Sequence, residues 1–112
     1  MRLLQRIQSY TATKNQAHDN LEDMLVELRG RGINFRFEKV EEDGQSYFVA
    51  RSVDYTRGTI ITSGATIEEL EHNIKDAIFT AFEVPARFCH PALINIKGDL
   101  FEKQNQLVHV TT

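Results

Sequence analysis

The sequence of 112 residues predicts an α+β fold, in which a three-stranded antiparallel meander is followed by a long helix and a fourth strand. Three observations lead to this prediction. Apolar and polar residues alternate over 33–38, as in a strand with one buried face. The dipeptide Asp43-Gly44 is typical of a tight hairpin turn. A stretch with helical periodicity and a capping signal covers 66–84.

An extra helix is predicted before the first strand. Residues 11–20 are small and polar, and we interpret them as a linker. Asp19 is then the predicted N-cap of a helix over 19–29. The apolar face of this helix consists of Leu21, Met24, Leu25 and Leu28. We therefore predict a separate N-terminal segment over 1–18, which we expect to be flexible, and a single domain over 19–112.

The meander is predicted from the residues around the Asp43-Gly44 turn. Its first strand contains 33–38, and the returning strand covers 46–53. Both turn residues accept the positive φ that a type I′ turn requires. A third short strand is predicted over 59–62.

The long helix begins with a T-x-x-E capping box formed by Thr66 and Glu69, and its pattern stops before Pro85. Its apolar residues recur at helical spacing, at Ile67, Leu70, Ile74, Ala77, Ile78, Ala81 and Phe82. A fourth strand is predicted over 92–96. The polar stretch 98–106 then leads to the tail 107–110, which we expect to pair at a sheet edge.

The charge of the chain is unevenly distributed. The net charge is −3, but residues 33–84 contain five basic and ten acidic residues. An acidic centre repels phosphate, so direct nucleic-acid binding is disfavoured and a basic protein partner is favoured. A solvated acidic surface without any partner remains the alternative. No apolar run is long enough for a membrane helix, and the single cysteine, Cys89, suits a reducing cytoplasm.

No residue pattern predicts catalysis, a cofactor or a metal site. Cys89 and His90 are adjacent, but neighbours in an extended loop point apart, and no second cysteine completes a zinc pattern. The acids at the start of the long helix oppose the helix dipole, which explains them without a function. Acids in or next to the strands, Glu38 and Asp54, lie near the ends of polar-facing runs.

Taken in order, three segments resemble the HicB family of antitoxin domains. They are the hairpin turn Glu42-Asp43-Gly44, the strand Tyr47–Arg51 and the helix start Gly64–Leu70, the last followed by Asn73 and Ala77. The resemblance covers about 33–84. It implies a β-β-β-α-β partial ribonuclease H-like fold without catalytic residues. It also implies a function: such proteins bind and neutralise a small basic HicA-type toxin that cleaves RNA.

On this resemblance, the partner would be bound by the acidic hairpin and by the connection over 54–58, where Asp54 and Gly58 match the family's pattern. The predicted contact residues are Glu41, Glu42, Asp43, Asp54, Tyr55 and Arg57. Many HicB proteins also bind their operator through a C-terminal domain. We do not expect this here, because 85–112 is short and lacks basic, periodic helices.

Two other functions remain open. The chain could be a free-standing homo-oligomer of the same superfamily, whose helix over 19–29 buries against a neighbouring subunit. Open sheets expose edges, and assembly is one way to cover them. Less favoured is a divalent-metal nuclease, which would need strand carboxylates that converge on the metal ions.

Overall fold

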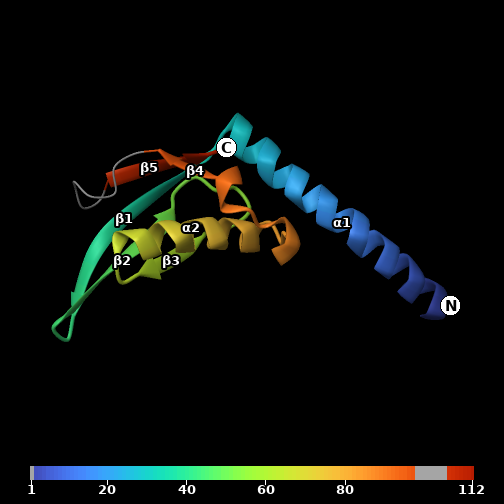
Figure 1. The fold of residues 1–112 in the computed structure, drawn as a ribbon, viewed down its shortest axis with the longest axis horizontal. Helices are drawn as coiled ribbons and strands as arrows, with labels where there is room; N and C mark the ends of the chain where they lie inside the picture. The colour runs from blue at the N-terminus through green and yellow to red at the C-terminus, as the bar shows by residue number, and fades with distance from the viewer. Residues whose placement is uncertain (1, 98–105) are drawn as a thin grey trace.

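The computed structural model describes residues 2–97 and 106–112. It has an α+β fold, as predicted: two α-helices and a five-stranded antiparallel sheet with strand order β3-β2-β1-β5-β4. Figure 1 shows the helix α2 lying along one face of the sheet, while the first half of α1 extends away from the rest of the molecule. None of the described helices is long and apolar enough to cross a membrane.

The first helix is longer than predicted. α1 runs without a break over Arg2–Gly30, so the prediction of a linker over 11–20 with an N-cap at Asp19 is wrong. The helix also continues through the predicted boundary at 18/19. The sequence before Gly30 contains neither glycine nor proline, and its polar residues include good helix formers such as Lys14 and Gln16. Polarity was therefore mistaken for a break in the helix.

The second half of α1 packs on the body of the molecule. Ala17, Met24 and Leu28 are buried and recur at helical spacing, and the hydroxyl of Thr111 donates to the carbonyl oxygen of Leu28 at 2.7 Å. On the alternative reading, this part of the helix would have been buried against a neighbouring subunit. Met24 and Leu28 instead belong to the chain's own hydrophobic core.

The meander is confirmed. β1 covers Ile33–Glu42, β2 covers Gln45–Ser52 and β3 covers Ile61–Gly64, two residues later than predicted. Asp43 and Gly44, with φ of 53° and 79°, form the turn between β1 and β2. Both have the positive φ of a type I′ hairpin.

α2 covers Ile67–Ala81 and carries the predicted N-cap. The hydroxyl of Thr66 accepts the backbone N–H of Glu69 at 3.1 Å. The helix ends earlier than predicted because Glu83 takes a left-handed conformation, with φ of 56°. The N–H of Val84 then reaches back to the carbonyl of Phe79 at 2.9 Å, as in a Schellman motif.

Two strands follow α2 where one strand and an edge tail were predicted. Short 3₁₀ helices form at Ala86–Phe88 and Pro91–Leu93, and the second covers the first two residues of the strand predicted over 92–96. β4 begins later than predicted and covers Asn95–Lys97. β5 covers Gln106–Thr111 and lies between β1 and β4, so the tail does not form an edge. The predicted polar connection over 98–106 lies outside the described residues except for Gln106.

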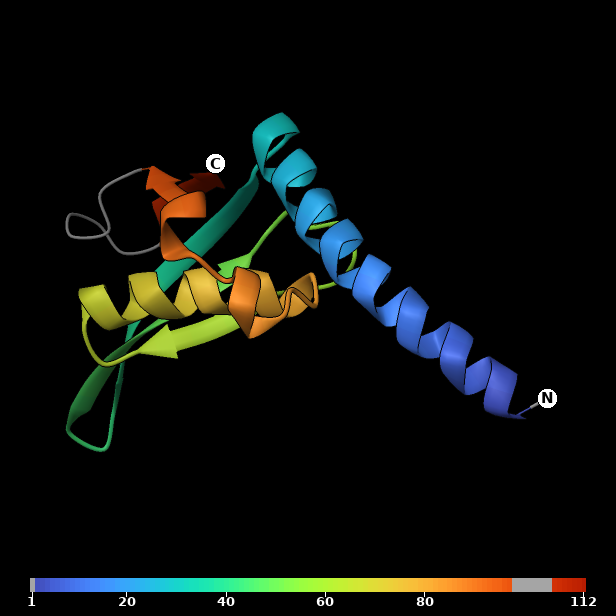
Figure 2. The same ribbon diagram turned by 45° about the vertical axis from the view of Figure 1, so that its right-hand side comes forward.

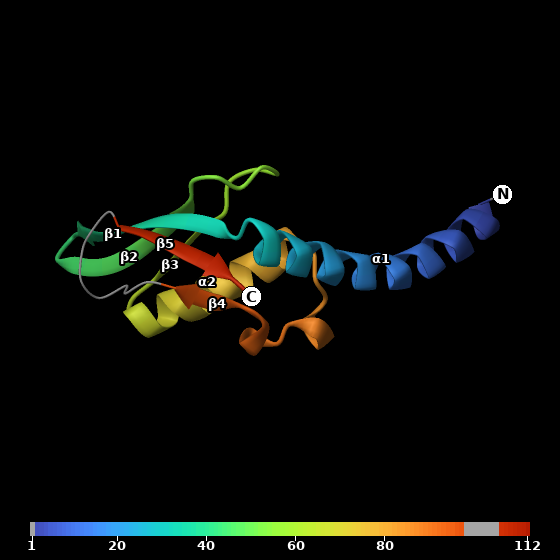
Figure 3. The same cartoon turned by 90° about the horizontal axis from the view of Figure 1, so that it is seen from above.

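The core lies between the sheet and the two helices. Alternate residues of β1 and β5 point into it, together with one face of α2. Its largest fully buried side chains are Phe35, Met24, Leu28, Ile33, Leu70, Ile74, Ile78, Ile94, Val108 and Val110. The opposite face of the sheet has no described helix over it, as the view from above shows (Figure 3).

Candidate protein-interaction site

The acidic hairpin is the first half of the predicted contact surface. Glu41, Glu42 and Asp43 are all exposed at the turn that joins β1 to β2. They line a shallow hollow of about 250 Å³ together with Gly44, Gln45 and Ser46. Three successive carboxylates at a turn create a local negative potential, which favours a cationic partner.

Only weak contacts engage these hairpin acids within the described part of the chain. The Lys39 ammonium lies 4.0 Å from a Glu41 carboxylate oxygen, and both groups are well exposed to solvent. The hydroxyl of Tyr47 donates to Glu42 at 3.0 Å. This hydrogen bond, with the adjacent negative charge, raises the pKa of Tyr47. Exposed contacts of this kind add little to stability, so the acids are not needed to hold the hairpin together.

The second half of the predicted surface, the connection over 54–58, has a clear structural role. The carboxylate of Asp54 accepts the backbone N–H of Asn34 at 2.9 Å and its side-chain N–H at 2.8 Å. The side-chain oxygen of Asn34 lies 2.8 Å from Nδ1 of His109. Asp54 thus fastens the end of β2 to the start of β1, and both of its oxygens are occupied.

Tyr55 faces the interior. Its ring packs against Phe82 at the end of α2, with centroids 5.6 Å apart and planes tilted by 59°. The hydroxyl is buried and has no hydrogen-bond partner among the described residues. Burial raises the pKa of Tyr55, an effect partly opposed by the positive charge of Arg57. Tyr55 therefore contributes to packing through its ring, while its hydroxyl oxygen is buried without a hydrogen bond among the described residues.

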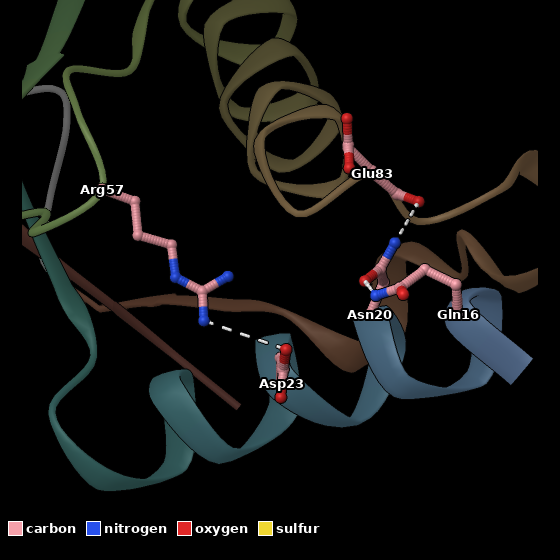
Figure 4. A network of polar contacts seen from close by, with 5 residues as sticks. All are labelled: Gln16, Asn20, Asp23, Arg57 and Glu83. Carbon is pink, nitrogen blue, oxygen red and sulfur yellow. Dashed lines mark hydrogen bonds and ion pairs between the residues drawn. The ribbon is translucent and has the colours of Figure 1, made fainter. Parts of the chain in front are cut away.

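Arg57 joins the connection to both helices. Its guanidinium carbon lies 5.2 Å from the centroid of the Phe82 ring, and one of its nitrogens is 3.8 Å from the carboxylate of Asp23 on α1. Figure 4 shows this contact beside a second one, in which the side-chain amide of Asn20 donates to the carbonyl of Glu83 at 3.3 Å. Together they bind α1 to the end of α2.

The structure does not bring the two halves of the predicted surface together. The hairpin turn and the 54–58 connection lie at opposite ends of β2, whose eight residues span roughly 26 Å. Glu41, Glu42 and Asp43 form one surface, whereas Asp54, Tyr55 and Arg57 form a structural joint next to α1. Sequence reasoning grouped them because it could not place the two ends of β2 in space.

The thiol of Cys89 is held by backbone acceptors. The thiol of Cys89 donates to the carbonyl oxygens of Pro85 and Val84, at 3.3 and 3.4 Å. Burial raises its pKa, with a smaller contribution from Asp76. A small hollow of about 70 Å³ lies beside it. Among the described residues, no group of three or more His, Cys, Asp or Glu side chains is placed to hold a metal ion.

The sequence reading missed one feature on the uncovered sheet face. Arg36 and Arg51 lie directly opposite each other on β1 and β2. They line a hollow of about 300 Å³ with Glu38, Val49 and Val53. Alternation within each strand could have placed both arginines on the polar face, but their direct pairing depends on the register of the hairpin.

Comparison with known proteins gives no assignment: the chain matches no protein-family model, no curated protein and no solved structure. The resemblance to HicB domains therefore depends on the sequence motifs alone. Two of these motifs form the structures that their residue types favour, namely the Asp43-Gly44 turn and the Thr66 cap.

Proposed function

We propose that this chain is a HicB-like, non-enzymatic domain of the antitoxin type. It binds a small basic toxin that cleaves RNA and neutralises it by protein–protein contact. The observation that carries the proposal is the exposed acidic turn formed by Glu41, Glu42 and Asp43. The order of three antiparallel strands and a helix is compatible with the HicB resemblance and supports it.

The position of the turn suits recognition of a cationic surface. The β1–β2 hairpin projects beyond α2 at the end of the molecule away from α1 (Figure 2), so a partner can approach its tip freely. Since no strong pair engages the acids among the described residues, their negative potential is directed toward the solvent. Complementary charge of this kind raises the association rate and does so most at low salt.

The 54–58 connection has a supporting part in this proposal. Asp54 and Tyr55 hold the joint between β1, β2 and α2, as their hydrogen bonds and packing indicate. The side chain of Arg57 remains 58% exposed despite its contact with Asp23. We therefore assign the main partner contact to the hairpin. Arg57 is also accessible to a partner, but it lies at the other end of β2.

The first test is capture. The tagged full-length chain is purified from its native lysate at low salt, and the co-purifying proteins are identified by mass spectrometry. A stoichiometric small basic protein is the expected result. Its RNA-cleaving activity, with and without the captured chain, then tests neutralisation.

The second test uses charge reversal at the hairpin. The E41K/E42K variant is expected to associate with the captured partner about ten to a hundred times more slowly, with a weaker dependence on salt. The matched control is D19K/E22K, which changes the net charge equally at two exposed sites within α1. Equal association rates for both variants and the wild type would place the contact elsewhere.

A free-standing oligomer is the second candidate function. It is favoured by the first half of α1, which extends away from the body and is covered by no described element of this chain (Figures 1 and 2). If capture returns only the chain itself, at a multiple of 12.9 kDa, this second function replaces the first.

A further inference from the structure

The uncovered face of the sheet has two features that are unfavourable when only water covers it. One is a cross-strand row, given by the strand registers, that contains Leu107, Arg36, Arg51 and Ile61 in this order on β5, β1, β2 and β3. Like charges directly opposite each other destabilise a sheet, and the two arginines occupy the centre of this row. The other feature is apolar exposure, because Leu107 and Ile61 at the ends of the row are 51% and 54% exposed.

The neighbouring rows continue this pattern. Val53, the first residue after β2 and next to the arginine row, is 47% exposed. On the other side of the arginine row, Glu38 pairs with Val49. Arg36, Glu38, Val49, Arg51 and Val53 together line the hollow of about 300 Å³. The face thus has an apolar content and a sharp charge pattern, but no described helix over it.

Charge is ordered along β1 on this face. Arg36 lies nearer the end of the sheet where α1 joins, whereas Glu38 follows toward the hairpin turn. A surface with a basic end and an acidic end is complementary to itself when one copy is turned end for end. In a C₂ dimer the same patch on both subunits forms the interface, so the patch must be complementary to itself. A patch with one basic and one acidic end meets this requirement.

From this arrangement we propose that the uncovered sheet face binds the same face of a second copy of the chain. The two copies are related by a two-fold axis that runs perpendicular to the strands, between the row of Arg36 and the row of Glu38. β1 then lies over β1 of the partner, with each Arg36 opposite the Glu38 of the other copy. Val49 then lies opposite Arg51 of the other copy, beside the Glu38 with which it is paired, and Val53 lies toward the margin of the interface. Two sheets that pack in this way form a sandwich, about 10 Å apart.

The charges exclude the other simple orientation. A two-fold axis parallel to the strands would superimpose each row on itself, so that the arginines of one copy would face the arginines of the other. Juxtaposed like charges within an interface are strongly unfavourable. The area is at the small end for a dimer: four strands, each about 4.8 Å from the next and about six residues long, cover roughly 400 Å² per face in projection, and more as accessible surface.

The test is the oligomeric state of the full chain and of three variants, measured by analytical ultracentrifugation over a wide concentration range. The wild type is expected to form a dimer. R36E and E38R each place like charges opposite each other twice per dimer, and each should raise the dissociation constant about tenfold or more. The double variant R36E/E38R restores opposite charges across the interface, and its dissociation constant should return to within a few-fold of the wild type.

The control is K39E, on the same strand but on the opposite face, with the same change of net charge as R36E. It should leave the dimer intact. A monomer at all concentrations overturns the proposal. So does a dimer that R36E does not weaken, or one that the double variant fails to restore, since either result would mean that another surface, such as the first half of α1, joins the copies. Thermal melts of each variant verify that the fold is retained.

Discussion

Tyr55 provides a sharp test of the joint between the 54–58 connection and α2. Its hydroxyl is buried without a hydrogen-bond partner among the described residues, while its ring packs on Phe82. A buried polar group that makes no hydrogen bond costs roughly 1–3 kcal/mol. Tyr55→Phe removes the oxygen and keeps the ring. We therefore expect the variant to be more stable than the wild type, by about 1 kcal/mol.

The measurement is urea-induced unfolding, followed by circular dichroism and analysed at equal m-values. For a domain of this size, 1 kcal/mol corresponds to an increase in Tm of roughly 4 °C. Tyr47→Phe is the matched control, because the hydroxyl of Tyr47 has a partner, Glu42, at 3.0 Å. This variant should be no more stable than the wild type. A loss of stability in Tyr55→Phe would show that its hydroxyl makes a favourable interaction, and our account of the joint would then be wrong.

Two further predictions concern a glycine and alkaline pH. Gly64→Ala would place its Cβ 2.5 Å from a backbone nitrogen in the first turn of α2, so we expect a loss of about 2–3 kcal/mol in urea unfolding. Gly30→Ala, where no atom lies within 4 Å, should change stability little, and an equal loss in both variants would contradict the close-contact explanation. Because the pKa of Tyr55 is raised in the folded state, the unfolded chain loses its proton first, so the wild type should lose stability as pH rises above about 10. Thermal melts between pH 9 and 11 should show a smaller loss for Tyr55→Phe, and equal losses would mean that Tyr55 titrates normally.

Local signals predicted most of the fold. The turn at Asp43-Gly44, the cap at Thr66 and the alternation over 33–38 depend on neighbouring residues, and each forms the structure that its residue types favour. Errors arose where the outcome depends on distant contacts. The tail could not be placed between β1 and β4 from its own sequence, because its position depends on pairing with residues more than 70 positions earlier in the chain.

The candidate site was predicted less well, for a related reason. The predicted contact residues are close in the sequence, but the eight-residue strand β2 lies between the hairpin acids and the 54–58 connection and places them at opposite ends of the sheet. The acidic turn could be recognised as exposed from its residue types alone. The role of Asp54 could not, since its partner Asn34 is 20 residues away in sequence. The Arg36–Arg51 pair, likewise, exists only once the hairpin register is known.

The two proposed contacts, one with a basic partner and one with a second copy of the chain, use different charged residues. Partner binding is assigned to the end of the β1–β2 hairpin, whereas self-association is assigned to the rows of Arg36 and Glu38 within the sheet. Reversal of Glu41 and Glu42 acts at the turn, beyond these rows, and R36E leaves the turn unchanged. Loss of partner binding in the first variant with an intact dimer, and loss of the dimer in the second with partner binding retained, would establish the contacts as independent. If R36E abolished both, the basic partner would require two hairpins presented by one dimer.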